Sequence, residues 1–266
     1  MEITRFEIKY DSAAKDYEIL LVPLGDFHVG SINCNKEKLE KYVKWITDTP
    51  NIYWWGMGDY ADCIIWQDAK RFDFDTLDPN LPTPDEQYQY VKDLLTPIKD
   101  RCFGLHLGNH DYELQRRHGH RYVDLDLCKP LNLKFLGFNA FIRLHLERVG
   151  KNGQTIDICS THGSSYARTA GGKINALMNW ANGFDADIFA MGHLHDKFAH
   201  ERPYYALSTN MTLVERRQVF VLTGGFEEGY KEGTVSYIER RNLNPIKTGI
   251  VKITINPETK NIRAQA

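Results

Sequence analysis

Short apolar runs that stop at a glycine followed by polar residues recur along the first half of the chain. Three of them are evident: Glu18–Asp26, Asn51–Asp59 and Arg101–Asp111. Such compact runs are typical of strands buried on both faces. Between them, apolar residues follow helical spacing over 35–50, where Asn35 is a candidate cap, and over 84–100, which begins with Pro84. The first half therefore predicts strands that alternate with helices.

The second half is richer in strand patterns. Alternating residues over 138–163 predict a β-hairpin with a turn at Asn152-Gly153. A short helix is predicted over 173–184, a strand over 186–196, and mostly strand from Pro203 onward.

Two less regular segments complete the pattern. The acidic, proline-containing stretch 63–84 is expected to cross the surface, and the arginine-rich stretch 111–131 to be partly helical. We find no repeat or low-complexity segment, and we expect one α/β domain over 1–266, with two sheets or one large mixed sheet.

Polar side chains cluster where five of the apolar runs end. They stand beside glycines in the stretches GDFH, GMGD, GNHD, STHG and GHLH, and are Asp26, His28, Asp59, Asn109, His110, Asp111, His162, His193 and His195. Five of the ten histidines of the chain are among them, so the clustering is not a property of histidine in general. The carboxyl ends of strands are where ligand-contacting residues collect in open α/β sheets. Taken singly, each residue has a structural explanation as a turn, a cap or a hydrogen-bonded core residue. Their joint occurrence favours a site.

The donor types indicate a metal centre. Imidazole, carboxylate and amide groups together suit Mn, Fe, Zn or Ni, and the scattered cysteines offer no thiolate set. The donors are too many for one ion, whereas one bridging carboxylate would let them hold two. Two-metal sites serve in-line displacement at phosphorus, so the pattern predicts phosphoester hydrolysis.

The order DxH, GD, GNHD, H and GHxH resembles the signature of the calcineurin-like metallophosphoesterase superfamily, and every motif is filled between Asp26 and His195. The resemblance implies a four-layer αββα sandwich with a dimetal site at the strand ends. It implies that one metal is held by Asp26, His28, Asp59 and His195. It implies that the other is held by Asp59, Asn109, His162 and His193, so that Asp59 bridges the two.

The same resemblance makes His110 a catalytic histidine that is not a metal ligand, with Asp111 as the carboxylate that orients it. The nucleophile would be a metal-bound hydroxide. His193 and His195 lie two residues apart, and in an extended chain both would project to the same side and serve different ions. Leu194 would then point into apolar packing.

The substrate is less closely defined. The chain reads GDYADCI where Ser/Thr phosphatases of the superfamily have GDxVDRG, which disfavours protein phosphatase activity. GNHD and GHLH also occur in nucleases of the Mre11 and SbcD type and in cyclic-nucleotide phosphodiesterases. The segment 233–245 resembles phage and mobile-element phosphoesterases. Three functions remain open: a nuclease or phosphodiesterase acting on nucleic acid, a small-molecule or cyclic-nucleotide phosphoesterase in which 63–84 could form a lid, and a metal-binding scaffold without catalysis.

Several cationic and aromatic residues near the motifs are candidate substrate contacts. Guanidinium groups match phosphate geometry and a tyrosine ring can stack on a base; the candidates are Arg116, Arg117, Arg121, Arg168 and Tyr112. The alternative for the arginines is a solvated helix face.

Composition and charge bear on the binding partners and the cellular location of the protein. The chain has 266 residues, of which 42% are hydrophobic, and a net charge of -2, so no global basic field indicates nucleic-acid binding. No apolar run approaches the roughly 20 residues of a membrane span, and the acidic N-terminus is unlike a signal peptide. The five cysteines lack CxxC spacing. We therefore expect a cytoplasmic enzyme that uses two divalent cations, most simply Mn, on a phosphoester substrate such as DNA, RNA or a nucleotide, with a homo-oligomer left open.

Overall fold

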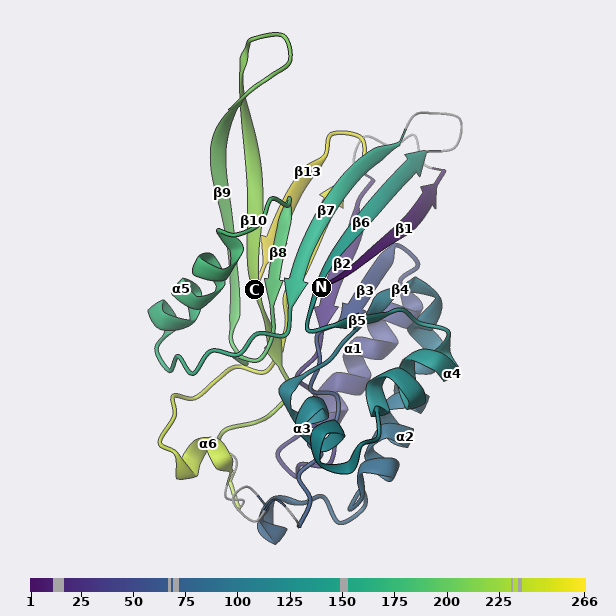
Figure 1. Cartoon of the computed structure of the whole chain (residues 1–266), viewed down its shortest axis with the longest axis vertical. Coiled ribbons are helices and arrows are strands. Elements are labelled where there is room, and N and C mark those ends of the chain that lie inside the picture. The colour runs from purple at the N-terminus through teal and green to yellow at the C-terminus, as the bar shows by residue number, and fades with distance from the viewer. Residues whose placement is uncertain (12–16, 67, 69–71, 149–152, 231, 234–235) are drawn as a thin grey trace.

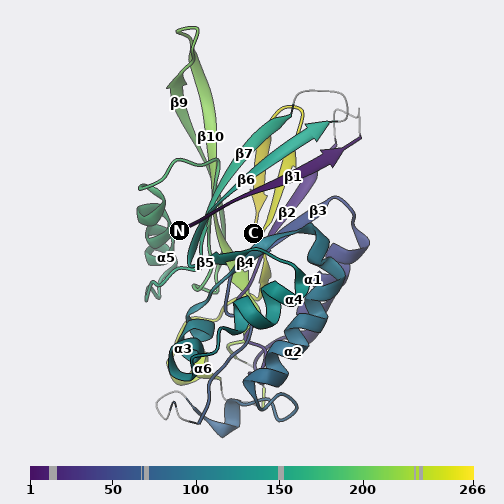
Figure 2. The ribbon, with the colours of Figure 1, turned by 45° about the vertical axis from the view of Figure 1, so that its right-hand side comes forward.

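The computed structural model describes residues 1–11, 17–66, 68, 72–148, 153–230, 232–233 and 236–266. Within these ranges the chain forms two mixed β-sheets, one of seven strands and one of six, which pack face to face with helices on their outer faces (Figure 1). Turning the molecule by 45° shows α5 on one side of the strands and α1, α2 and α4 on the other (Figure 2).

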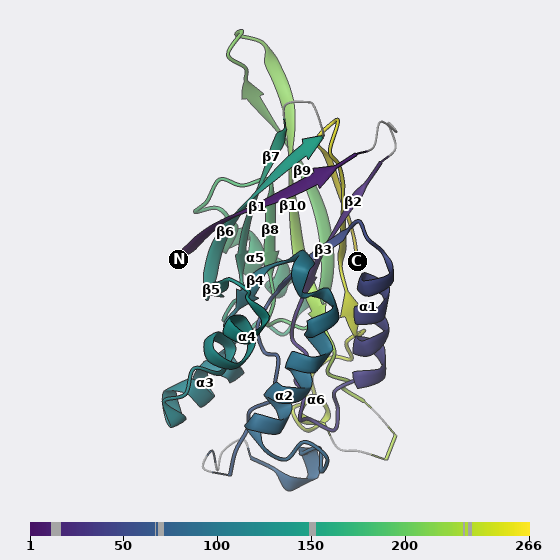
Figure 3. The ribbon, with the colours of Figure 1, turned by 90° about the vertical axis from the view of Figure 1, so that its right-hand side faces the viewer.

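The seven-stranded sheet has the order β1-β6-β7-β8-β10-β11, with β9 also paired to β10. Its strands are β1 (Glu2–Tyr10), β6 (Asn139–Arg148), β7 (Gln154–Thr161), β8 (Ile188–Met191), β9 (Lys197–Leu207), β10 (Leu213–Gly225) and β11 (Gly249–Ile250). The pair β6 and β7 is the predicted antiparallel hairpin, although Asn152 of its predicted turn lies outside the described residues. The β9–β10 hairpin extends well beyond the rest of the sheet (Figures 1 and 3).

The six-stranded sheet has the order β13-β12-β2-β3-β4-β5. Its strands are β2 (Ile19–Leu24), β3 (Ile52–Gly56), β4 (Cys102–His106), β5 (Phe135–Gly137), β12 (Lys252–Asn256) and β13 (Asn261–Gln265). Strands β2, β3, β4 and β5 run parallel, so their carboxyl ends meet at one edge of the sheet.

The two helices predicted in the first half of the chain begin where the sequence analysis places them. The helices are α1 (Lys36–Asp48), α2 (Pro84–Leu95), α3 (Asn109–His118), α4 (Lys129–Leu131), α5 (Ala170–Ala181) and α6 (Tyr237–Arg240). The Asn35 side chain accepts a hydrogen bond from the Lys38 N–H and caps α1, and Thr83 with Glu86 forms a capping box at α2. Shorter turns are 3₁₀-helical at Phe74–Thr76 and Thr96–Arg101 and π-helical at Val123–Cys128.

Three apolar clusters separate four layers. One lies between the two sheets and contains Trp55; one lies between the six-stranded sheet and α1 and α2 and contains Trp54; the third packs α5 on the seven-stranded sheet. Trp54 and Trp55 are adjacent in β3 and both fully buried, because successive side chains of a strand point to opposite faces. The predicted α/β fold with a four-layer arrangement is confirmed.

Several elements differ from the sequence analysis. The helix predicted over 173–184 is α5 at Ala170–Ala181, and the strand predicted over 186–196 is β8 at Ile188–Met191. β1 was not predicted, and it pairs in parallel with β6 over nine residues, from Glu2↔Ala140 to Tyr10↔Arg148. β9 begins at Lys197, six residues before the predicted start at Pro203. Both strands alternate intermediate or exposed positions with few buried ones, so their apolar pattern is weak. In the described part of the chain, no helix has the length and apolar character needed to cross a membrane.

Candidate metal centre

The predicted ligands come from the ends of strands in both sheets. Asp26 and His28 follow β2, Asp59 follows β3, and Asn109 opens α3 just after β4. From the other sheet, His162 follows β7, and His193 and His195 follow β8. Since β2, β3 and β4 are parallel neighbours, as are β7 and β8, the side chains of all five strand ends converge.

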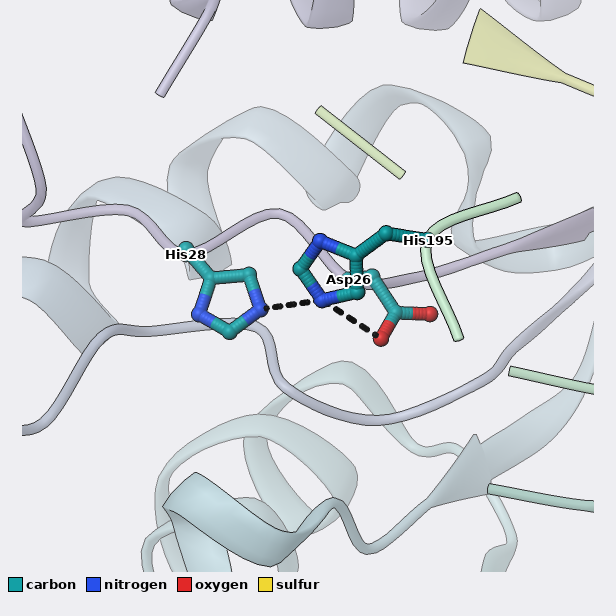
Figure 4. A group of neighbouring side chains, drawn as sticks. All are labelled: Asp26, His28 and His195. Atoms are coloured by element: carbon teal, nitrogen blue, oxygen red, sulfur yellow. Dashed lines mark hydrogen bonds and ion pairs between the residues drawn. The ribbon is translucent and has the colours of Figure 1, made fainter. Parts of the chain in front are cut away.

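One group consists of Asp26, His28 and His195, whose ligand atoms all lie within 4.8 Å of one another. Figure 4 shows the two imidazoles meeting edge to edge, with Nε2 of His28 3.1 Å from Nε2 of His195. The same His195 nitrogen lies 3.5 Å from Oδ1 of Asp26. Three potential ligand atoms thus surround one point.

A second group consists of Asp59, His162 and His193. Nε2 of His162 lies 3.3 Å from Oδ2 of Asp59. That same carboxylate oxygen lies 3.9 Å from Nε2 of His28 in the first group, so Asp59 lies between the two groups. The structure therefore brings together the residues that the resemblance divides between two ions.

The orientation of the Asn109 amide indicates whether the second group needs a cation. Its Oδ1 lies 2.9 Å from Nε2 of His162. With the amide turned over, the nitrogen in that place would donate to Oδ2 of Asp59 at 3.2 Å and to Nδ1 of His193 at 2.7 Å. The inner atom of Asn109 thus faces a carboxylate oxygen and two imidazole nitrogens. A shared cation would satisfy these acceptors with the oxygen inward.

The separations between donor atoms fit cation binding. Ligands about 2.1 Å from one ion, in tetrahedral or octahedral geometry, lie roughly 3.0–3.4 Å from each other. Within the two groups, the donor distances of 3.1 and 3.3 Å fall in this range and that of 3.5 Å lies just above it. The residues present therefore fit two divalent cations, and their mixed nitrogen and oxygen donors suit Mn, Fe, Zn or Ni without choosing among them.

The backbone is strained at these ligands. Five of the seven predicted ligands have φ between 50° and 65°, a left-handed conformation that residues other than glycine adopt rarely: Asp26, His28, Asp59, His193 and His195. Such residues cost of order 1–3 kcal/mol each and gather at functional sites. Ten non-glycine residues among those described have a positive φ, and five of them are these ligands. We attribute this concentration to the need to direct the side chains toward common points.

This finding also corrects the account of the two histidines in GHLH. The segment is not extended: His193 has φ 65° and His195 has φ 50°, and β8 has already ended at Met191. Both imidazoles reach the site because the backbone turns at each of them. Leu194 between them is buried in the cluster under α5, as predicted.

Charges in the site compensate one another. Burial raises the pKa of Asp26 to about 7 against the opposing effect of His162. Burial alone would also raise the pKa of Asp59, but the imidazoles of His162, His110 and His28 hold it well below its ordinary value. Burial lowers the pKa of His193 to about 4, with His162 adding to the effect. Binding of cations by these donors would be accompanied by the release of protons.

His110 lies at the edge of this cluster, half-buried, with its ring edge-to-face on His28 at 4.7 Å. Its backbone N–H donates to Oδ1 of Asp59 at 2.8 Å, and its Nδ1 lies 2.7 Å from the carbonyl oxygen of Asp62. A carbonyl only accepts, so Nδ1 carries the hydrogen and Nε2 is directed away from this bond. His110 also forms a third group with His28 and Asp59, whose possible ligand atoms all lie within 4.8 Å of one another.

Asp111 does not contact His110 in the way expected. Its Oδ2 accepts hydrogen bonds from the backbone N–H groups of Asp59, at 2.8 Å, and Gly108, at 3.0 Å, and its Oδ1 accepts one from the Tyr88 hydroxyl. Asp111 therefore fixes the two loops that carry Asp59 and Asn109. In the described structure Asp62, rather than Asp111, is the partner of His110.

Two acidic residues that sequence reasoning missed lie in the site. Oδ1 of Asp62 is 3.5 Å from Nδ1 of His28 and 3.6 Å from Nδ1 of His110. Oε2 of Glu227 is 3.8 Å from Nδ1 of His195, and burial raises the pKa of Glu227. Glu227 follows the apolar run of β10 and its Gly224-Gly225 end. The strand-end rule that found the other five clusters would have found this one too.

The predicted substrate contacts are not gathered in one place. Arg116 and Arg117 both bond Glu113, Arg117 also lies 3.7 Å from Asp68, and Arg121 pairs with Asp124. Arg168 is exposed in the loop after His162. Tyr112 is 40% exposed and packs edge-on against Phe138 at 5.1 Å, close to the site. Contact of these residues with a substrate stays a prediction.

Comparison with known proteins gives structural likenesses only. No family model matches the chain, and no curated protein matches it. Zn-complexed Vps29 from Entamoeba histolytica is 14% identical with a TM-score of 0.43, the match covering 93% of this chain and 97% of that one. A metallophosphoesterase from Sphaerobacter thermophilus is 12% identical with a TM-score of 0.42, covering 93% and 87%. The calcineurin-like phosphoesterase YfkN from Bacillus subtilis is 12% identical with a TM-score of 0.42, covering 82% and 87%. Similarity at this level carries no conclusion about what this chain binds or catalyses.

Proposed function

We propose that this chain is a hydrolase of phosphoesters of the calcineurin-like metallophosphoesterase type, working with two divalent cations. The observation that carries the proposal is the convergence of seven donor side chains from five strand ends into two groups around Asp59. Asp26, His28 and His195 would hold one cation, and Asn109, His162 and His193 the other. Bound cations supply Lewis-acid activation of water and neutralise charge at the phosphate.

The chain's own residues then have distinct tasks. Asp59 lies between the groups, and its backbone N–H donates to Oδ2 of Asp111. His110 keeps Nδ1–H on the Asp62 carbonyl, so Nε2 faces away from that bond. In the imidazolium form, the Nε2–H would stabilise phosphoryl charge or protonate the leaving oxygen. The bond to Asp62 fixes the ring orientation that this task requires.

The finer proposal is a phosphodiesterase that acts on nucleic acid or nucleotides with Mn. It is supported by the motif forms GNHD and GHLH and by the aromatic pair Tyr112 and Phe138 beside the site. A relationship to nucleases of the Mre11 and SbcD type or to phage phosphoesterases is part of this proposal and rests on the motifs alone. A cytoplasmic location and a homo-oligomeric state are likewise proposals from the sequence.

One assay panel tests the activity. Purified Mn-loaded protein is incubated with bis-p-nitrophenyl phosphate, p-nitrophenyl phosphate, 2′,3′-cyclic nucleotides, and labelled single- and double-stranded DNA. We expect diester hydrolysis that chelation abolishes. His110→Ala should retain both ions and lose about 10²–10⁴-fold in turnover, the usual contribution of a general acid or base. Absence of hydrolysis of every substrate by protein holding two ions would instead support a metal-binding scaffold.

A further inference from the structure

A cavity of about 800 Å³ opens beside the second donor group. Its walls come from the start of β6, the loop after His162, α5 and the end of β8, including Phe138, Gly163, Ala176, Trp180, Phe184 and Met191. The volume lies within the range of small-molecule sites, roughly 300–1,000 Å³. A nucleoside would fit in such a space.

The cavity is joined to the metal centre through the backbone. The carbonyl oxygen of Phe138 accepts the His162 N–H at 3.2 Å, and Gly163 follows His162 directly. Met191 stands two residues before His193, and a Cβ at Gly163 would lie only 2.9 Å from its Cγ. The cavity wall and two of the predicted ligands are therefore parts of the same loops.

The side chains that line the cavity are uncharged, and Phe138, Trp180 and Phe184 among them are aromatic. Among the described residues that line the cavity, no side chain is an aspartate, glutamate, lysine, arginine or histidine. Trp180 packs against Phe184, with centroids 5.4 Å apart, and Phe138 is 41% exposed although it is a large apolar side chain. The Phe138 ring is held in a T-shaped contact with Tyr112, and a partly exposed aromatic ring in the lining is available to pack against a planar ligand.

The cavity has uncharged side chains, whereas the metal centre would hold cations. This difference restricts which molecule can bind to both. Phosphate charge belongs with the cations and His110, while the cavity suits the uncharged planar part of the same molecule. Aromatic side chains bind nucleobases by stacking with little regard to base identity. The hydroxyl and amide groups of Ser164, Ser165 and Asn139 in the lining can meet polar base edges.

We propose that this cavity binds the nucleobase attached to the phosphate that the metal centre hydrolyses. The inference rests on the proposed function and names its substrate class: nucleotides, or nucleic acid with an unstacked base. A base paired within a duplex cannot enter without leaving its stack.

The test compares two ligands that differ only in the base. Dissociation constants of adenosine 5′-monophosphate and ribose 5-phosphate are measured on the Mn-loaded full chain by calorimetry. We expect the nucleotide to bind roughly fivefold to hundredfold more tightly, the effect usual for one stacked base. Phe138→Ala, which removes a wall, and Ala176→Phe, which fills the space, should both bring this ratio close to one.

Tyr166→Ala is the matched control. Tyr166 stands in the same loop as Gly163 but is 95% exposed and outside the cavity lining, so its loss should leave the ratio intact. Thermal unfolding of all three variants shows that they fold. Equal affinity for the two ligands in the parent protein, or a preference that Tyr166→Ala abolishes and Ala176→Phe does not, would overturn the inference.

Two further comparisons separate the possible outcomes. Hydrolysis of bis-p-nitrophenyl phosphate without any nucleotide preference would refute the cavity assignment alone, whereas failure to hydrolyse any phosphoester would refute the proposed function. A 5′-phosphorylated single-stranded tetranucleotide that binds more tightly than the mononucleotide identifies a strand as the source of the base, and equal binding identifies a free nucleotide. A duplex that binds as tightly as the single strand in both the parent and Ala176→Phe would contradict the cavity assignment.

Discussion

His106 makes a measurable prediction about how the two sheets are held together. It ends β4, is fully buried, and its Nδ1 lies 2.9 Å from the Gly137 carbonyl oxygen while its Nε2 lies 2.7 Å from the hydroxyl of Ser160 in the opposite sheet. The carbonyl only accepts, so Nδ1 carries the hydrogen and Nε2 accepts from Ser160. Burial lowers the pKa of His106 from 6.5 to about 4. The folded protein therefore keeps this imidazole neutral.

The sign of the pH effect follows from that shift. Below pH 6.5 the unfolded chain takes up a proton that the folded chain refuses, so stability is complete above pH 6.5 and is lost as the pH falls toward 4. At 1.36 kcal/mol per pKa unit, the full loss is about 3 kcal/mol, of which about 1.4 kcal/mol has occurred at pH 5.5. His106→Gln lacks the titrating group and should be spared this loss.

Urea unfolding of metal-free protein at pH 7.5 and pH 5.5 measures the effect, with chelator present throughout so that metal release does not contribute. The free-energy difference between the parent and His106→Gln should shrink by about 1.4 kcal/mol on going to pH 5.5. Ser160→Ala is the control: it removes the hydroxyl but keeps the imidazole buried, so it should retain the parent's pH dependence. A difference between parent and His106→Gln that stays constant would refute the argument that burial keeps His106 neutral.

Three further predictions concern the site and one helix end. His193→Ala and His195→Ala should each leave about one of two ions per chain, and the two variants should lose different ions. Metal counting after dialysis in mixed Mn and Zn measures this. Loss of both ions in both variants would contradict the division into two groups. In Gly108→Ala the new Cβ would lie 2.0 Å from Oδ1 of Asp59, so metal affinity should fall by about ten- to hundredfold in titrations. Gly171→Ala, which meets no atom within 4 Å, should bind metal as the parent does. Arg101→Ala removes hydrogen bonds to the carbonyl oxygens of Thr47 and Thr49 at the end of α1 and of Ile52 at the start of β3. It should cost about 1.5–3 kcal/mol in urea unfolding, and an unchanged midpoint would show that water replaces these bonds fully.

The local elements were predictable because their causes are local. Asn35 caps α1 through its own side chain, and Thr83 with Pro84 starts α2, so neighbouring residues alone determine both helix starts. The short apolar runs became β2, β3, β4 and β8 because a continuous run of apolar residues is stable only where both faces are covered. Strand β1 escaped prediction because its pairing partner β6 lies more than 100 residues away and its own alternation is weak.

The candidate site was likewise predictable in part. Its residue types and their positions after strand ends were evident along the chain, since parallel strands bring their carboxyl ends to one edge whatever the details of packing. The direction of each side chain was not. Asp111 bonds the backbone N–H groups of Asp59 and Gly108, and Asp62 is the residue that bonds His110. These partners could not be predicted, because only folding brings the groups within hydrogen-bond distance.

The sequence by itself determined most of the strands and helices, although not β1, together with the donor set and the expectation of two cations. Capping, apolar spacing and the chemistry of imidazole and carboxylate act within a few residues. The tertiary structure decided how those donors divide around Asp59, the left-handed backbone at five of them, and the neutral aromatic cavity beside His162. These features depend on distances between β2, β3, β4, β7 and β8, and such distances exist only once the two sheets have packed against each other.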